Sequence, residues 1–146
     1  MRGRFTRNKE RGTQVAELAM VLPLLLFLGL AVSEGSGFVR VHQILNNAAR
    51  EGARLSSLPE NFQGVPSIKD AVVSYATTNG VPITANDVTI NQCAIIVTTT
   101  GINKWASQVT VTHVYTMRYM PRIPWFNVRN TVTLRGTAEF VNFYGC

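Results

Sequence analysis

One long apolar segment limits what this chain can be. Between Thr13 and Ser33 the only charged residue is Glu17, and residues 18–32 (LAMVLPLLLFLGLAV) are apolar without a break. As a helix, this stretch of about 21 residues would reach roughly 31 Å, close to the hydrocarbon thickness of a bilayer. Its Leu, Val and Phe residues favour insertion by about 3 to 6 kcal/mol, whereas a carboxylate costs about 3 kcal/mol. The sequence therefore predicts a membrane-spanning helix.

The charges flanking this segment predict its orientation. The net charge is +6, and the first 12 residues carry +4 because five basic residues face only Glu10: Arg2, Arg4, Arg7, Lys9 and Arg11. The positive-inside rule then places the N-terminus in the cytoplasm and the rest outside it. Subtracting +4 from +6 leaves +2 for residues 13–146, too little for a phosphate-binding footprint, so we expect no nucleic-acid partner.

Two structures remain open for the apolar segment. It could be a secretory signal cleaved near Ala31-Val32-Ser33. Against this, small and apolar residues continue at steps of three and four beyond that point, as on one face of a helix: Phe38, Val41, Leu45, Ala48, Gly52 and Leu55. The pattern favours one helix from about Gln14 to Ser57, roughly 66 Å long, with a kink at Pro23. Leu58-Pro59 ends it.

Residues 59–146 predict a small α+β domain. A short helix fits residues 67–79, with Ser67 as its cap and Asn79-Gly80 as its end. Strands are expected at 87–100, 106–120 and 130–144. On the first strand Val88, Ile90, Ala94 and Ile96 alternate, with a mixed stretch around Cys93 to Val97. Alternation predicts inward side chains on the other two: Val109, Val111, Tyr115, Met117 and Tyr119; Val132, Leu134, Ala138 and Phe140. The fold class is α+β, a long helix joined to a short helix and an antiparallel sheet of three or four strands.

Glu17 has two interpretations. It could lie at the headgroup level, where its cost is small. Alternatively, a cut after Gly12 would make Thr13 the first residue and Glu17 the fifth. The carboxylate could then neutralise the new amine of a neighbouring subunit and set the register between subunits.

Residues 11–54 resemble a known family. Arg11-Gly12, then Thr13-Gln14-Val15-Ala16-Glu17 and an apolar run with Leu22-Pro23, resemble the processing site of type IV pilin-like proteins. Glu34 and residues 43–54 (QILNNAAREGAR) resemble the TadE-like family, minor pilins or pseudopilins of the Tad (Flp) pilus apparatus. The resemblance implies cleavage between Gly12 and Thr13 by a prepilin peptidase, and a role for Glu17 in assembly. Leu18 departs from the aromatic residue that family members often have there.

Other residues are candidates for contacts. Arg50 and Arg54, four apart and of like charge, could form a solvated face or contact acidic groups of neighbouring subunits or lipid headgroups. Ala48, Ala49, Gly52 and Ala53 form a strip of small residues that another helix or a sheet could approach closely; in a pilin-like body this would be the chain's own sheet. Trp125 and Phe126 could cap the sheet or anchor a partner.

The two cysteines could form a disulfide, and the sequence has no motif for catalysis or metal binding. Cys93 and Cys146 lie on the exported side, where a disulfide closing a loop of about 50 residues would contribute on the order of 4 kcal/mol, and two free thiols are the alternative. His113 lies on an apolar strand face with only His42 as a counterpart, so no metal site is expected. No nucleophile with a base or phosphate-binding loop is apparent, so we expect neither an enzyme nor a cofactor.

These inferences combine into one hypothesis. The chain would have a leader at 1–12, a transmembrane helix at 13–33, a helix extension at 34–58 and an exported domain at 59–146. It would sit in the cytoplasmic membrane and assemble with pilin or pseudopilin subunits and pilus assembly proteins. The alternative is a secreted or membrane-tethered binding module that enters no filament.

Overall fold

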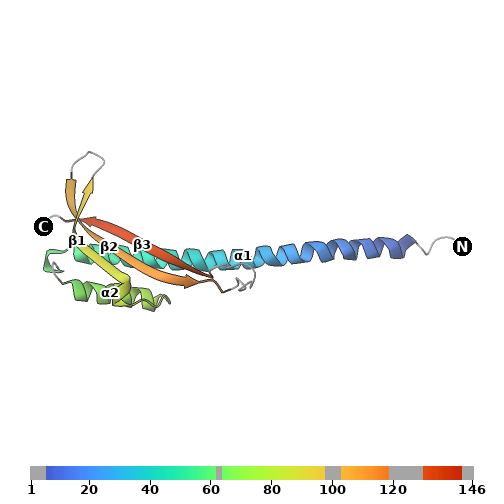
Figure 1. The fold of residues 1–146 in the computed structure, drawn as a ribbon, viewed down its shortest axis with the longest axis horizontal. Helices are drawn as coiled ribbons and strands as arrows, with labels where there is room; N and C mark the ends of the chain where they lie inside the picture. Colours follow the sequence, from blue (N-terminus) through green and yellow to red (C-terminus); the bar gives the residue numbers. More distant parts are fainter. Residues whose placement is uncertain (1–5, 62–63, 98–102, 119–129, 143–146) are drawn as a thin grey trace. The chain divides into compact units, whose positions relative to one another are not determined.

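The computed structural model describes residues 6–61, 64–97, 103–118 and 130–142. Within it, side chains are described from Gln14 onward, except those of Val97 and Asn103. The elements are α1 (Thr6–Ser56), η1 (Pro59–Asn61), α2 (Val65–Thr78), η2 (Ala85–Asp87), β1 (Val88–Val97), β2 (Asn103–Thr116) and β3 (Thr131–Val141) (Figure 1). The chain divides into two compact units, Met1–Gly37 and Phe38–Cys146, with the boundary inside α1. The α+β class and the long N-terminal helix are confirmed.

The second unit is built on an antiparallel sheet in the order β1-β2-β3. Val109 is aligned with Ile90 on one side and with Ala138 on the other. The β2–β3 register is continuous from Ala106–Val141 to Thr116–Thr131. Between β1 and β2 the register shifts, because three steps from Asn91 to Ala94 oppose two steps from Gln108 to Ala106. This bulge adds one residue to β1.

The second half of α1 packs on the sheet together with α2. Buried residues from α1, α2, the segment after α2 and all three strands form one hydrophobic core: Leu45, Ala48, Ala49, Ala53, Val72, Ala76, Val81, Ile83, Val88, Val109, Val111 and Leu134. The rings of Phe38 and Tyr115 meet edge to face, with centroids 6.0 Å apart. The alternation along β2 thus produced the expected buried face, because Val109 and Val111 are fully buried.

Two glycines allow the close approach of these elements. A Cβ at Gly136 of β3 would lie 2.5 Å from the backbone carbon of Leu45 and 2.7 Å from the backbone nitrogen of Asn46. A Cβ at Gly52 of α1 would lie 2.5 Å from Cγ2 of Val72 and 3.2 Å from Cγ1 of Val109. Such distances are shorter than carbon atoms tolerate, so α1 can lie against β3 and α2 only because these side chains are absent.

Several local predictions were wrong. Ser67 does not cap α2, which begins earlier with Gly64 as the N-cap and Pro66 in its first turn; the Ser67 hydroxyl donates instead to the Gly64 carbonyl. Proline fits this first turn because its missing N–H would be unpaired there in any case. At the other end Asn79 is the C-cap, and Gly80 has a positive φ of 86°, as expected for a helix ending at Asn79-Gly80.

The predicted strand faces also differ in two places. Beyond the bulge Ile95 is aligned with Trp105, so Ala94 and Ile96 do not continue the face of Val88 and Ile90. Phe140 is 43% exposed, although alternation predicted burial. It lies on β3, at the edge of the sheet, and is aligned with the buried Ser107 of β2.

Candidate functional site

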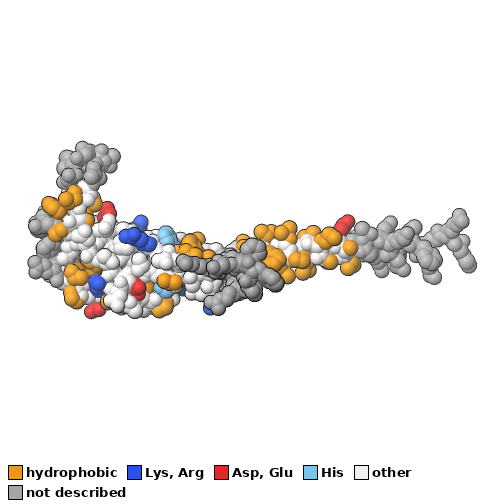
Figure 2. Space-filling model, in the orientation of Figure 1, with side chains coloured by type: hydrophobic (Ala, Val, Ile, Leu, Met, Phe, Trp, Pro, Cys, Tyr) orange, Lys and Arg blue, Asp and Glu red, His pale blue; other side chains and the backbone are white. Residues whose placement is uncertain are grey.

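The apolar segment of α1 exposes its side chains on every side. All side chains from Gln14 to Ser33 are exposed, and those of the large hydrophobic residues range from 42% at Leu30 to 82% at Met20. Figure 2 shows hydrophobic side chains along this stretch. The helix Gln14–Ser56 contains a window of mean hydropathy 2.4, which by length and composition is sufficient to cross a membrane. Such a surface needs lipid or other chains to cover it.

The residues of the predicted processing site all lie in α1. Gly12 and Thr13 belong to the helix, which begins at Thr6 rather than near Gln14. The predicted cleavage bond is therefore within helical backbone. Glu17 is exposed among the apolar side chains, and Pro23 lies inside the helix. The roles of these four residues, including the kink at Pro23, stay predictions.

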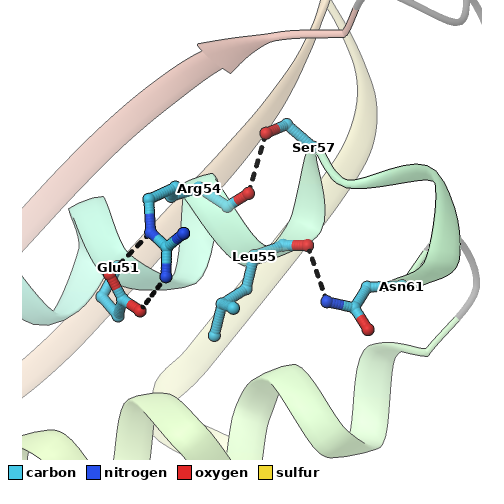
Figure 3. A network of polar contacts seen from close by, with 5 residues as sticks. All are labelled: Glu51, Arg54, Leu55, Ser57 and Asn61. Carbon is cyan, nitrogen blue, oxygen red and sulfur yellow. Dashed lines mark hydrogen bonds and ion pairs between the residues drawn. The ribbon is translucent and has the colours of Figure 1, made fainter.

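In the second unit, α1 carries charged groups opposite its buried face. The guanidinium of Arg54 donates two hydrogen bonds to Glu51, from Nε to Oε2 at 3.0 Å and from Nη2 to Oε1 at 2.7 Å (Figure 3). The hydrogen bond with Arg54 lowers the pKa of the Glu51 carboxyl, and the same contact raises the pKa of Arg54. Arg50 is exposed and has no ion-pair partner among the residues the structure describes. Arg50 is thus the more available of the two predicted contact residues.

A polar cluster ties the end of α1 to the sheet. We call Ser56, Asn61, Gln92, Ser107 and Asn142 the end cluster. The buried Ser107 hydroxyl lies 3.1 Å from the Ser56 carbonyl and 2.9 Å from Oδ1 of Asn142, and it has one hydrogen to donate. Asn61 donates to the carbonyl of Leu55 at 3.2 Å (Figure 3). Asn142 donates to the Gln92 carbonyl, and Gln92 donates to that of Asn61.

One buried hydroxyl in the end cluster, that of Ser56, has no hydrogen-bond partner among the described residues. Ser56 is fully buried, and its Oγ makes no hydrogen bond with any other part of the chain that the structure describes. The sequence alone does not reveal this cluster, because its members are spread from residue 56 to residue 142 and resemble ordinary loop and strand residues. The small-residue strip, in contrast, was predicted correctly: Ala48, Ala49, Gly52 and Ala53 are buried against the chain's own sheet and α2.

Some predicted contact residues lie outside the described part of the chain. These are Trp125, Phe126 and Cys146, so the partner contact of the first two and the Cys93–Cys146 disulfide stay predictions. Among the described residues, no group of three or more His, Cys, Asp or Glu side chains could hold a metal ion. His113 is half-buried on β2 and aligned with Leu134.

The fold and this surface define a class: an α+β body carried on a helix that is long and apolar enough for a membrane anchor. A family model described as TadE-like protein matches residues 12–54. The match covers α1 from the predicted cleavage site almost to the end of the helix, the part of the chain in which the sequence resembles this family. No curated protein and no solved structure matches the chain.

Proposed function

We propose that this chain is a TadE-like minor pilin or pseudopilin that takes part in assembling a Tad (Flp) type IV pilus or a related secretion apparatus. The observation that carries the proposal is the apolar segment of α1, exposed on all sides and continuous with a helix that packs on an α+β body. The family match to residues 12–54 supports a pilus context. The chain acts by assembly and not by chemistry.

Assembly would proceed from the cytoplasmic membrane. The basic N-terminal stretch stays in the cytoplasm, the apolar segment spans the bilayer, and residues 59–146 are exported. A prepilin peptidase cleaves between Gly12 and Thr13, and the apolar segment then moves from lipid into contact with other pilin or pseudopilin subunits. Both environments cover its apolar surface, so the transfer exposes little of it to water.

Glu17 provides the specificity of this contact in the proposal. A carboxylate in apolar surroundings is costly unless it is paired. After cleavage each chain would carry an amine at Thr13, about one helical turn before its own Glu17. The Glu17 carboxylate of one subunit would pair with the Thr13 amine of the neighbouring subunit. Pairing would favour one axial register over others.

N-terminal sequencing of the exported protein tests the processing step. A mature N-terminus at Thr13 supports the pilin route. A start near Glu34 supports ordinary secretion, and an intact Met1 supports a plain anchor, which is the case for a tethered binding module.

The Glu17→Ala variant tests the assembly step. We expect it to insert in the membrane normally but to enter the pilus or pseudopilus fraction at about a tenth of the wild-type level or less, because an unpaired buried amine costs several kcal/mol. Gln14→Ala, another exposed polar position of the same segment, is the matched control and should assemble normally. Equal incorporation of Glu17→Ala and the wild type would exclude this role for Glu17.

A further inference from the structure

In the second unit, β2 runs along α1 in the opposite direction (Figure 1). At one end the Ser107 hydroxyl lies 3.1 Å from the Ser56 carbonyl. At the other end the ring of Tyr115 contacts that of Phe38. The eight residue steps between these two contacts on β2 extend about 26 Å, and the eighteen steps between them on α1 extend about 27 Å. The two elements therefore stay side by side over this length, and β2 ends beside Phe38.

The pairing of β2 with β3 continues to the same end of the sheet. Thr116 is aligned with Thr131, and the N–H of Met117 donates to the carbonyl of Asn130 at 2.7 Å. Exposed side chains of α1, β2 and β3 surround this place. We call these residues the Phe38 end: Val39 and Arg40 of α1, Val114 and Thr116 of β2, and Thr131 and Thr133 of β3.

The length of chain keeps the Phe38 end close to the end of the apolar segment. Phe38 follows Ser33 by five residues. Five residues extend about 7 Å as a helix and at most about 18 Å as an extended chain. The headgroup layer of a bilayer is about 5 to 8 Å thick on each side. With residues 13–33 in the hydrocarbon core, Phe38 is within reach of the lipid headgroups whatever angle the body takes.

The exposed side chains of the Phe38 end suit a membrane surface. Val39 and Val114 are apolar, yet they are 51% and 58% exposed. Arg40 is exposed and forms no ion pair with any residue in the described ranges. In the sequence, residues 113–133 contain three arginines and no acid, and residues 34–42 add Arg40 and Glu34, so the two stretches together carry +3. Apolar side chains beside basic ones are typical of surfaces that bind anionic membranes.

We propose that the Phe38 end binds the surface of the bilayer that holds the apolar segment. Arg40 contacts the phosphate groups of the lipid headgroups, and Val39 and Val114 enter the headgroup layer. The inference rests on the membrane anchor of the proposed function and adds a second contact with lipid. A single helix leaves the body free to tilt on its anchor, whereas contacts from both α1 and the sheet hold it in one orientation before it meets neighbouring subunits.

Photo-crosslinking of the full chain in liposomes of phosphatidylethanolamine and phosphatidylglycerol tests this contact. Benzoylphenylalanine replaces Val114 or, as the matched control, Lys104, an exposed residue near the other end of the same strand. Mass spectrometry then measures the fraction of the chain that carries a lipid adduct. We expect at least about fivefold more adduct at Val114 than at Lys104, because about 33 Å of strand separates the two positions.

A second probe position guards against a local effect of the label. Thr133 is exposed, is aligned with Val114 and lies on a different strand, so a label there should also form the lipid adduct. Equal adduct formation at Lys104 and at both probe positions would overturn the proposal. Crosslinks from Val114 and Thr133 to a second protein chain in place of lipid would overturn it as well.

Reversal of one charge tests the role of Arg40. Arg40→Glu should lower the yield of the Val114 adduct about threefold or more, because the phosphate groups would then face a carboxylate. Arg50→Glu makes the same change at an exposed position of α1 about 15 Å further from the apolar segment and should leave the yield unchanged. Equal yields in these two variants would exclude the contact of Arg40 with lipid.

The outcome separates this contact from the proposed function. If the mature protein begins at Thr13 and assembly depends on Glu17, yet Val114 gives no lipid adduct, the proposed function stands and the membrane contact is wrong. If Val114 gives the adduct but the mature protein keeps Met1, the membrane contact stands and the pilin route is wrong.

Discussion

Gly136 is the residue at which β3 comes closest to α1. An alanine there would place its Cβ 2.5–2.7 Å from backbone atoms of Leu45 and Asn46, and a helix backbone cannot yield as a side chain can. We expect Gly136→Ala to lower the free energy of unfolding by about 2 to 3 kcal/mol, as overpacked cores do. Urea unfolding of the full chain in detergent, followed by circular dichroism, measures this. Gly35→Ala, with nothing within 4 Å of the new Cβ, is the control and should be neutral or slightly stabilising. Equal effects at both positions would contradict the close approach.

Ser56 presents the opposite case, because removing its side-chain hydroxyl should stabilise the fold. Its buried hydroxyl has no hydrogen-bond partner within the described part of the chain, so Ser56→Ala removes an uncompensated desolvation cost and should raise the free energy of unfolding by about 1 kcal/mol. Ser107→Ala removes a hydroxyl that does have partners in the end cluster and should lower it by a similar amount. The same urea titration compares the two variants. A loss of stability in Ser56→Ala would mean that the hydroxyl is satisfied.

At the scale of elements, η2 is held by a charge-dependent cap. The Asp87 carboxylate accepts hydrogen bonds from the backbone N–H and the hydroxyl of Thr84, each at 2.8 Å, and these lower the pKa of Asp87 below its ordinary value. The cap therefore contributes fully above about pH 4, and its contribution is lost as the pH falls through the lower pKa of the folded state. We expect Asp87→Ala to cost about 0.5 to 1 kcal/mol at pH 7 and clearly less at pH 2.5, measured by urea unfolding. Equal losses at the two pH values would exclude the charged cap.

The elements themselves were largely predictable, whereas their contacts were not. Alternation places β2 and β3 within a few residues of their observed bounds, and steps of three and four locate the buried face of α1, because these patterns depend on local geometry alone.

The bulge after Asn91 depends on which strand pairs with β1, so Ala94 and Ile96 were assigned to the wrong face. Among the candidate site residues, Arg54 could have been paired with Glu51 from their i, i+3 spacing. The role of Gly136 could not be inferred, because Leu45 is far from it in sequence.

At the scale of the whole molecule, the hydrophobic core identified among the described residues lies entirely in the second unit. Its members and the residues packed against them begin at Phe38, and α1 contributes Leu45, Ala48, Ala49 and Ala53. The apolar segment contributes none of them. Folding of the body should therefore depend on the second half of α1 and be independent of the anchor.

A pair of truncations tests this division. A fragment that begins at Phe38 should be soluble and unfold cooperatively in urea, because it keeps every member of the core and every residue packed against it. A fragment that begins at Pro59 lacks the α1 residues that cover Val109, Val111 and Leu134, and its sheet would expose this apolar face to water. We expect the shorter fragment to aggregate or to show no cooperative transition. Cooperative unfolding of both fragments would mean that the sheet and α2 fold without any part of α1. If the fragment that begins at Phe38 does not unfold cooperatively, the body requires the apolar segment in order to fold.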